Sequence, residues 1–265
     1  MDEQQEQREE LNEELTRLVE PEVRKMSAVQ RILSVFISPG ELMSNIKEYP
    51  VFLVPYLVSV LIGLIAINTA LQATEIINQE LYNITIERYG ADILNLGGQA
   101  DVYGDIDDGI NVSALISSAV SIIISPFIIS FFAALVLWVL SKIFRCHGKL
   151  SHLFSMYMHI YILFALGSVI STSLMVMTGT PLDMTSLAAF LMPEGNMAMF
   201  SFNLLGTISI TSVWSAILAY IGIKILADAS SAKAGAITVI SFLLYMAVSA
   251  TLVTSTFLIF DMMGV

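Results

Sequence analysis

The chain has 265 residues, of which 56% are hydrophobic and only 13% are charged. Soluble domains of this size typically carry about a quarter charged residues, so the composition excludes an ordinary soluble domain and predicts a protein embedded in lipid. The net charge of -11 arises largely from the first 22 residues and from the segment 75–108, and no basic stripe suited to nucleic acid is present.

The first predicted unit is an N-terminal helical arm at 1–37, which we expect to lie in the cytoplasm. Leu11, Leu15 and Leu18 recur at helical spacing within a charged segment, which predicts a helix with a narrow apolar stripe. Residues 23–37 predict a second, amphipathic helix. Its apolar residues fall largely on one side: Met26, Val29, Ile32, Leu33, Phe36 and Ile37.

A short helix at 38–49 follows the arm. Ser38 is its predicted N-cap, Pro39 occupies the first helical position, and Glu41 is expected to complete a capping box. We expect this helix to lie flat on the inner membrane surface and, with the leucine stripe of the arm, to contact partner proteins. Its apolar face consists of Leu42, Met43 and Ile46.

Five long apolar runs come next, and none of them contains Asp, Glu, Lys or Arg. Each reaches the roughly 20 residues that an α-helix needs to cross about 30 Å of hydrocarbon. The sequence therefore predicts an all-α polytopic membrane domain at 38–265, with an outer loop at 72–111. The five predicted spans are 51–71, 112–140, 153–177, 199–223 and 234–260.

The placement of lysine and arginine predicts the orientation. Of the twelve basic residues, all except Arg88 fall before the first span, between the second and third, or between the fourth and fifth. Cytoplasmic loops carry the excess of basic residues, so the N-terminus is predicted in the cytoplasm and the C-terminus outside.

Two spans carry small polar residues four positions apart. They are Ser117, Ser121 and Ser125, followed by Pro126, in the second span, and Thr207, Thr211 and Ser215, beside Trp214, in the fourth. Such stripes are typical of close helix packing with interhelical hydrogen bonds, which is the interpretation we favour. The alternative is a polar groove between the two spans for a small molecule or lipid. Pro126 predicts a kink.

The sequence shows no clear metal, cofactor or catalytic pattern. His147, His152 and His159 cluster near the inner end of the third span, and Cys146 is the single cysteine. No acidic ligand accompanies them at metal spacing, which favours interfacial histidines over a metal site. An acidic run that begins at Asp101 departs from the EF-hand pattern. We therefore predict no enzyme, no metal and no cofactor.

Two segments carry a likeness to a known family. The first runs from Phe36 through Ser38-Pro39-Gly40-Glu41 to Tyr49-Pro50, directly before a span. The second has Trp214 in mid-helix, Gly222 near the helix end, and Lys233-Ala234 at the start of the last span. From Phe36 onward the chain resembles the Yip family, the Ypt/Rab-interacting membrane proteins, in its prokaryotic branch.

The resemblance implies a non-enzymatic membrane protein. Eukaryotic relatives act in vesicle traffic, but their cytoplasmic Asp-Leu-Tyr-Gly-Pro element is missing before the first span, so Rab binding is not carried over. Bacterial relatives are associated with ABC-type exporters and envelope stress. We therefore expect an accessory or scaffold protein of the bacterial cytoplasmic membrane. Its expected partners are the bilayer and other membrane proteins, and it could also form a homo-oligomer. The rival function is a transporter or channel, which a water-filled cavity between spans two and four would favour.

Overall fold

The computed structural model describes residues 25–89, 112–192, 195 and 199–262. Within these ranges the regular structure is helical, and β pairing is limited to one isolated bridge between Ser186 and Ser209. The predicted leucine stripe at Leu11, Leu15 and Leu18 lies outside the described residues, as does the acidic run that begins at Asp101.

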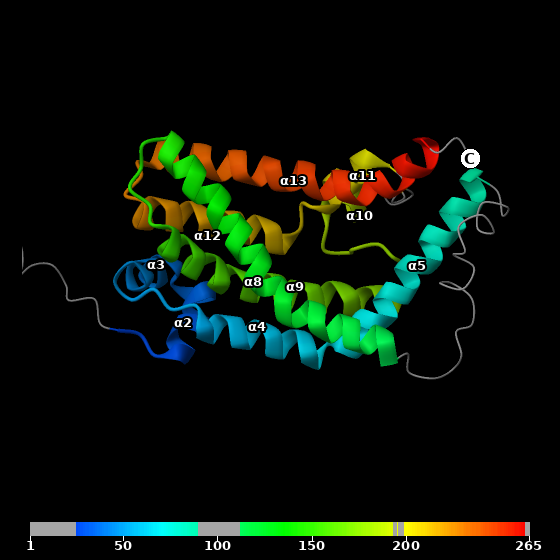
Figure 1. Cartoon of the computed structure of the whole chain (residues 1–265), viewed down its shortest axis with the longest axis horizontal. Coiled ribbons are helices and arrows are strands. Elements are labelled where there is room, and N and C mark those ends of the chain that lie inside the picture. Colours follow the sequence, from blue (N-terminus) through cyan, green and yellow to red (C-terminus); the bar gives the residue numbers. More distant parts are fainter. Residues whose placement is uncertain (1–24, 90–111, 193–194, 196–198, 263–265) are drawn as a thin grey trace, which may run out of the picture.

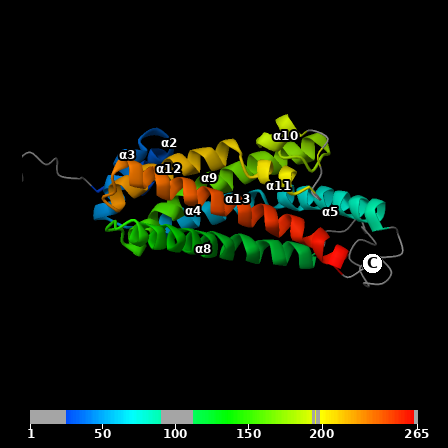
Figure 2. The same ribbon diagram turned by 90° about the horizontal axis from the view of Figure 1, so that it is seen from above.

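The helices form an elongated bundle (Figures 1 and 2), in which α2 and α3 cover one end while α5, α10 and α11 lie toward the other. We call the end that carries α2 and α3 the inner end. In chain order the helices are α2 (Ala28–Ile37), α3 (Pro39–Glu48), α4 (Leu53–Ile65), α5 (Ile67–Tyr89), α8 (Val112–Ile143), α9 (Leu150–Thr178), α10 (Leu187–Leu191), α11 (Phe200–Gly206), α12 (Ile210–Leu226) and α13 (Ser231–Met262).

Three helices are long and apolar enough to cross a membrane: Leu115–Ile143, Leu150–Thr178 and Ser231–Ser255. They confirm an all-α membrane protein. The pair α4 and α5 could form a span only together, because α4 has 13 residues and α5, with 23, is less apolar. The two helices are bent by 63° about Ala66. The uninterrupted hydropathy of the run at 51–71 suggests a single helix, but the structure has a bend within this run.

The predicted span at 199–223 is also divided, because α11 ends at Gly206 and α12 begins at Ile210. Backbone polar groups at membrane depth need partners inside the protein. The start of α10 and the residue Thr185 before it supply them. The Leu187 amide donates to the Ile208 carbonyl at 2.7 Å, and the Ile210 amide donates to the Thr185 carbonyl at 3.4 Å. Ser209 then starts α12 through a capping box with Ser212.

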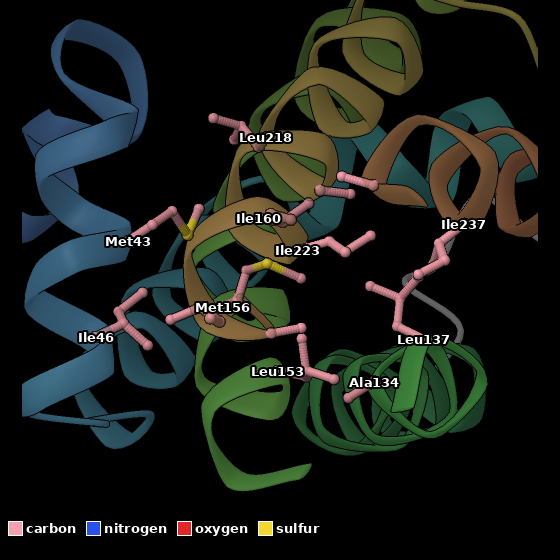
Figure 3. Close-up of a cluster of buried hydrophobic side chains, with 14 of the residues drawn as sticks. Met43, Ile46, Ala134, Leu137, Leu153, Met156, Ile160, Leu218, Ile223 and Ile237 are labelled. Atoms are coloured by element: carbon pink, nitrogen blue, oxygen red, sulfur yellow. The ribbon is translucent and has the colours of Figure 1, made fainter. Parts of the chain in front are cut away.

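The core lies where α3 meets the bundle. Leu42, Met43 and Ile46 of α3 are fully buried against α9 and α12. Figure 3 shows Met43 and Ile46 directed toward Met156 of α9 and Ile223 of α12. Helices of the same chain therefore cover this apolar face, and the expected position of α3 on the inner membrane surface stays a prediction.

The capping of α2 and α3 differs from the prediction. Ser38 does precede α3, and Pro39 takes the first helical position, but no side-chain hydrogen bond caps this helix. The Ser38 hydroxyl donates instead to the Ser34 hydroxyl at 3.2 Å, so the predicted capping box with Glu41 does not form. A capping box does start α2, where Ser27 and Gln30 exchange hydrogen bonds.

Candidate functional site

Helix α2 packs its polar side against the bundle. Arg31 is only 3% exposed, and its guanidinium donates to the Tyr49 carbonyl at 2.9 Å. Ser34 and Val35 are buried beside it. Burial lowers the pKa of the Arg31 guanidinium from its ordinary value, but arginine keeps its charge in proteins. A buried charge thus ties α2 to the segment that leads into α4.

The opposite side of α2 is apolar and exposed. Val29 is 65% exposed, Leu33 51% and Ile37 79%, and Phe36 lies beside them. We call these four residues the α2 apolar face. The sequence predicts the stripe correctly, but not that it points away from the protein. An apolar helix face in this position is typical of a surface that meets lipid or another protein.

Two long-range contacts connect α2 and α3 to the C-terminal half of the chain. The Trp214 indole donates to the Val35 carbonyl at 3.4 Å, and the Lys47 ammonium lies 2.6 Å from an Asp228 carboxylate oxygen. Gly222 provides space where α3, α9 and α12 meet, because a Cβ at this position would overlap the sulfur of Met156. Trp214 and Gly222, two of the residues that carry the family likeness, therefore lie against the α2–α3 segment.

The basic connectors gather at the inner end. The loop between α8 and α9 contacts the loop between α12 and α13, since the His147 amide donates to the Ala227 carbonyl at 3.0 Å. The ion pair between Lys47 and Asp228 connects the end of α3 to the loop between α12 and α13. Lys149 and Lys233, at the starts of α9 and α13, therefore lie on the same end of the bundle (Figure 1).

A cleft of about 390 Å³ lies between α8, α9, α12 and α13. Its walls are mainly aromatic and aliphatic side chains, and small residues of α12 contribute to its lining. Its lining includes Phe132, Tyr157, Tyr161, Ser215, Thr238 and Phe242. The cleft is therefore an apolar one rather than a polar channel.

The two polar stripes have separate positions. Ser125 and Tyr161 share a hydrogen bond of 3.2 Å between α8 and α9. Pro126 is buried, and α8 continues through it as one helix. Ser117 and Ser121 are exposed on the same helix.

On the fourth span, Ser215 is the stripe residue that lines the cleft, and its hydroxyl donates to the Thr211 carbonyl at 2.8 Å. Thr207 lies at the break before α12 and donates to the Leu204 carbonyl at 2.7 Å. The side chain of Thr211 packs where α9 passes Gly167. The hydroxyls of Ser215 and Thr207 therefore bond within their own chain segments, and the role of the stripe stays a prediction.

The three histidines differ in their exposure to solvent. His152 and His159 are buried on α9, and His147 is exposed in the loop before it. The His159 Nδ1 lies 2.7 Å from the Ser155 carbonyl. In the part of the chain that the structure describes, no group of three His, Cys, Asp or Glu residues could hold a metal ion.

Comparison with known families matches residues 33–253 to the family model described as the Yip1 domain. The chain belongs to the Yip1-domain family. The match begins inside α2 and ends inside α13, so the Yip1 domain includes the α2–α3 contacts and the cleft. Comparison with curated proteins finds no match, and comparison with solved structures finds none. As a Yip1-domain chain with several apolar helices of spanning length, the protein is an integral, multi-pass membrane protein.

Sequence reasoning missed Arg31 and Thr238. Arg31 lies within the amphipathic segment 23–37. A charged residue at that place was a signal that it could have a polar partner. Thr238 carries no signal of its own, because single threonines are common in membrane helices. Its buried position in the cleft depends on how α13 packs against α12.

Proposed function

We propose that this Yip1-domain protein is a non-enzymatic accessory protein of the bacterial cytoplasmic membrane. It would thread the bilayer five times, through α4 with α5, α8, α9, α11 with α12, and α13, with its N-terminus in the cytoplasm. The gathering of Lys47, Lys149 and Lys233 at one end of the bundle supports this orientation. The resemblance to bacterial Yip proteins supports a role beside a membrane complex such as an ABC-type exporter or an envelope-stress system.

The α2 apolar face is the observation on which the accessory role rests. A polar contact between Arg31 and Tyr49 holds α2 on the bundle, while Leu33 and Ile37 point outward. An exposed apolar face on a tethered cytoplasmic helix suits contact with a neighbouring protein at the membrane surface. The segment 1–24 precedes this helix, and we propose that its leucine stripe extends the docking surface. The α3 helix serves as the base that carries α2.

Partner capture from native membranes tests this role. The double variant Leu33→Gln/Ile37→Gln places amides on the α2 apolar face and leaves Arg31 in place. Ala28→Gln adds the same group to an exposed position of α2 outside that face. We expect the double variant to lose its co-purified membrane proteins and Ala28→Gln to keep them. An identical partner set from both variants and the native chain would contradict the docking role.

The break between α11 and α12 favours a second candidate function, a transporter of lipid or a small molecule. Discontinuous membrane helices often form the binding sites of transporters, and Asn203 beside this break donates to Thr254 of α13 at 2.8 Å. Reconstitution into vesicles that contain a fluorescent phospholipid separates the two functions. A transporter would accelerate exchange of the label between leaflets, whereas an accessory protein would leave the rate at that of empty vesicles.

A further inference from the structure

The cleft opens toward lipid rather than toward water. Phe132 of α8 and Leu244 of α13 stand at its mouth and are largely exposed, whereas Ser212 and Ala219 of α12 form a buried floor. Helix α8 packs mainly on α9, and α13 packs mainly on α12 and α11. Their lining residues lie within apolar stretches of spanning length. In a bilayer the mouth would therefore face acyl chains.

One polar atom in this cleft lacks a partner. Thr238 is 8% exposed, and its hydroxyl is buried without a hydrogen bond. Threonine and serine in helices usually donate to a carbonyl three or four residues back. Ser241 and Thr251 of the same helix do so, at 2.9 and 2.7 Å. A buried hydroxyl without a partner is unfavourable. Because Thr238 lines the cleft, rotation of its side chain would let this hydroxyl bond to a group that enters the cleft.

We propose that the cleft binds one ester-linked acyl chain of a membrane phospholipid, with the Thr238 hydroxyl donating to the ester carbonyl. The depth suits this bond. Thr238 lies seven residues after Ser231, the first residue of α13, which is about 10 Å along a helix. The headgroup region on each side of a bilayer is roughly 5–8 Å thick. Thr238 thus falls near the boundary where ester groups meet hydrocarbon.

The walls of the cleft suit an acyl chain. They are almost entirely apolar side chains, contributed by α8, α9, α12 and α13. A flexible, unbranched acyl chain matches such walls, which water would wet poorly. This inference is independent of the docking role of α2, and either can fail without the other.

Lipid titration of the purified full-length chain tests the proposed bond. Native mass spectrometry in detergent would compare a diester phosphatidylglycerol with its diether analogue, which has the same headgroup but no ester carbonyl. We expect the native chain to bind the diester about fivefold more tightly, the effect of one hydrogen bond. Thr238→Val should abolish this preference. Thr251→Val, the matched variant on the exposed side of α13, should keep it.

A second variant tests the location. Ala216 lines the cleft, and Ala216→Trp would fill it, so the tightly bound lipid should be absent. Leu252→Trp adds the same ring to an exposed position on α13 that does not line the cleft and should retain the lipid. Equal binding of diester and diether by the native chain would overturn the proposal. Lipid retained by Ala216→Trp would also overturn it, as would a preference for diester that persists in Thr238→Val.

Discussion

The indole nitrogen of Trp214 lies 3.4 Å from the carbonyl oxygen of Val35 and donates a hydrogen bond to it. The two residues are 179 positions apart in the chain, and they join α12 to the last turn of α2. Val35 itself is fully buried. This contact fixes how α2 sits on the bundle, and thereby which side of α2 the solvent or membrane meets.

Trp214→Phe tests this contact. The phenyl ring keeps most of the apolar packing but removes the donor, so we expect a loss of about 1 kcal/mol in stability. The loss should be local to α2, and hydrogen exchange of the amides in Ala28–Ile37 should become faster. Trp138→Phe, at the other tryptophan of the chain, should leave exchange in α2 unchanged. Equal exchange in α2 for Trp214→Phe and the native chain would contradict the proposed tie.

Gly222→Ala should destabilise the inner end. A Cβ at this position overlaps the Met156 sulfur and lies 3.3 Å from the Met43 sulfur, and overpacking of this kind costs about 1–3 kcal/mol. Gly235→Ala on α13 is the matched control, because its Cβ would meet nothing within 4 Å. That control should be neutral or slightly stabilising, since alanine favours a helix over glycine.

Thermal unfolding in detergent measures both glycine variants. The added substitution Met156→Ala should recover part of the loss in Gly222→Ala by making room for the methyl group. If Gly222→Ala and Gly235→Ala unfolded at the same temperature, the close approach of α3, α9 and α12 would be refuted.

The two caps at the N-terminal helices give contrasting expectations. Ser27→Ala removes a hydrogen-bonded N-cap from α2 and should cost about 1 kcal/mol of helix stability. Ser38→Ala removes a hydroxyl that caps nothing, so its effect on α3 should stay within about 0.5 kcal/mol. Hydrogen exchange in each helix reports the difference. If Ser38→Ala destabilised α3 more than Ser27→Ala destabilised α2, Ser38 would be the N-cap of α3 that the sequence predicts.

The ion pair between Lys47 and Asp228 should contribute little. The two side chains are 39% and 58% exposed, and exposed pairs are worth roughly 0–1 kcal/mol because water and salt screen them. Asp228 has a positive φ of 49°, which asparagine tolerates well. We therefore expect Asp228→Asn to shift stability by less than about 1 kcal/mol, with the shift shrinking in high salt. A larger, salt-independent loss in thermal unfolding would mean that the pair organises the inner end.

The uninterrupted helices could be predicted from the sequence. The runs at 112–140, 153–177 and 234–260 match α8, α9 and α13 closely, because long uncharged stretches are stable only as helices in lipid. The breaks at Ala66 and at 207–209 could not be predicted in the same way. The residues at both breaks are apolar or small, so mean hydropathy continues through them. The Leu187–Ile208 hydrogen bond that stabilises the second break comes from the start of α10, about 20 residues earlier in the chain.

The helix faces were predicted in part. Periodicity identified the apolar sides of α2 and α3, but it cannot say what each side contacts. Met43 of α3 faces the bundle because Gly222 leaves space for it, and Leu33 of α2 faces outward because Arg31 is bonded on the opposite side. Both outcomes depend on residues far away in the sequence. The docking residues and the polar stripes remain predictions.

Cysteine labelling in intact cells tests the five-pass threading most directly. Single cysteines would be introduced as Lys149→Cys, Lys233→Cys or Thr178→Cys, with the buried Cys146 replaced by alanine. We expect a membrane-impermeant maleimide to label Thr178→Cys, at the far end of α9, in intact cells. Lys149→Cys and Lys233→Cys should react only after the membrane is opened. Labelling of Lys149→Cys and Lys233→Cys from opposite sides would contradict the proposed topology and the accessory role built on it.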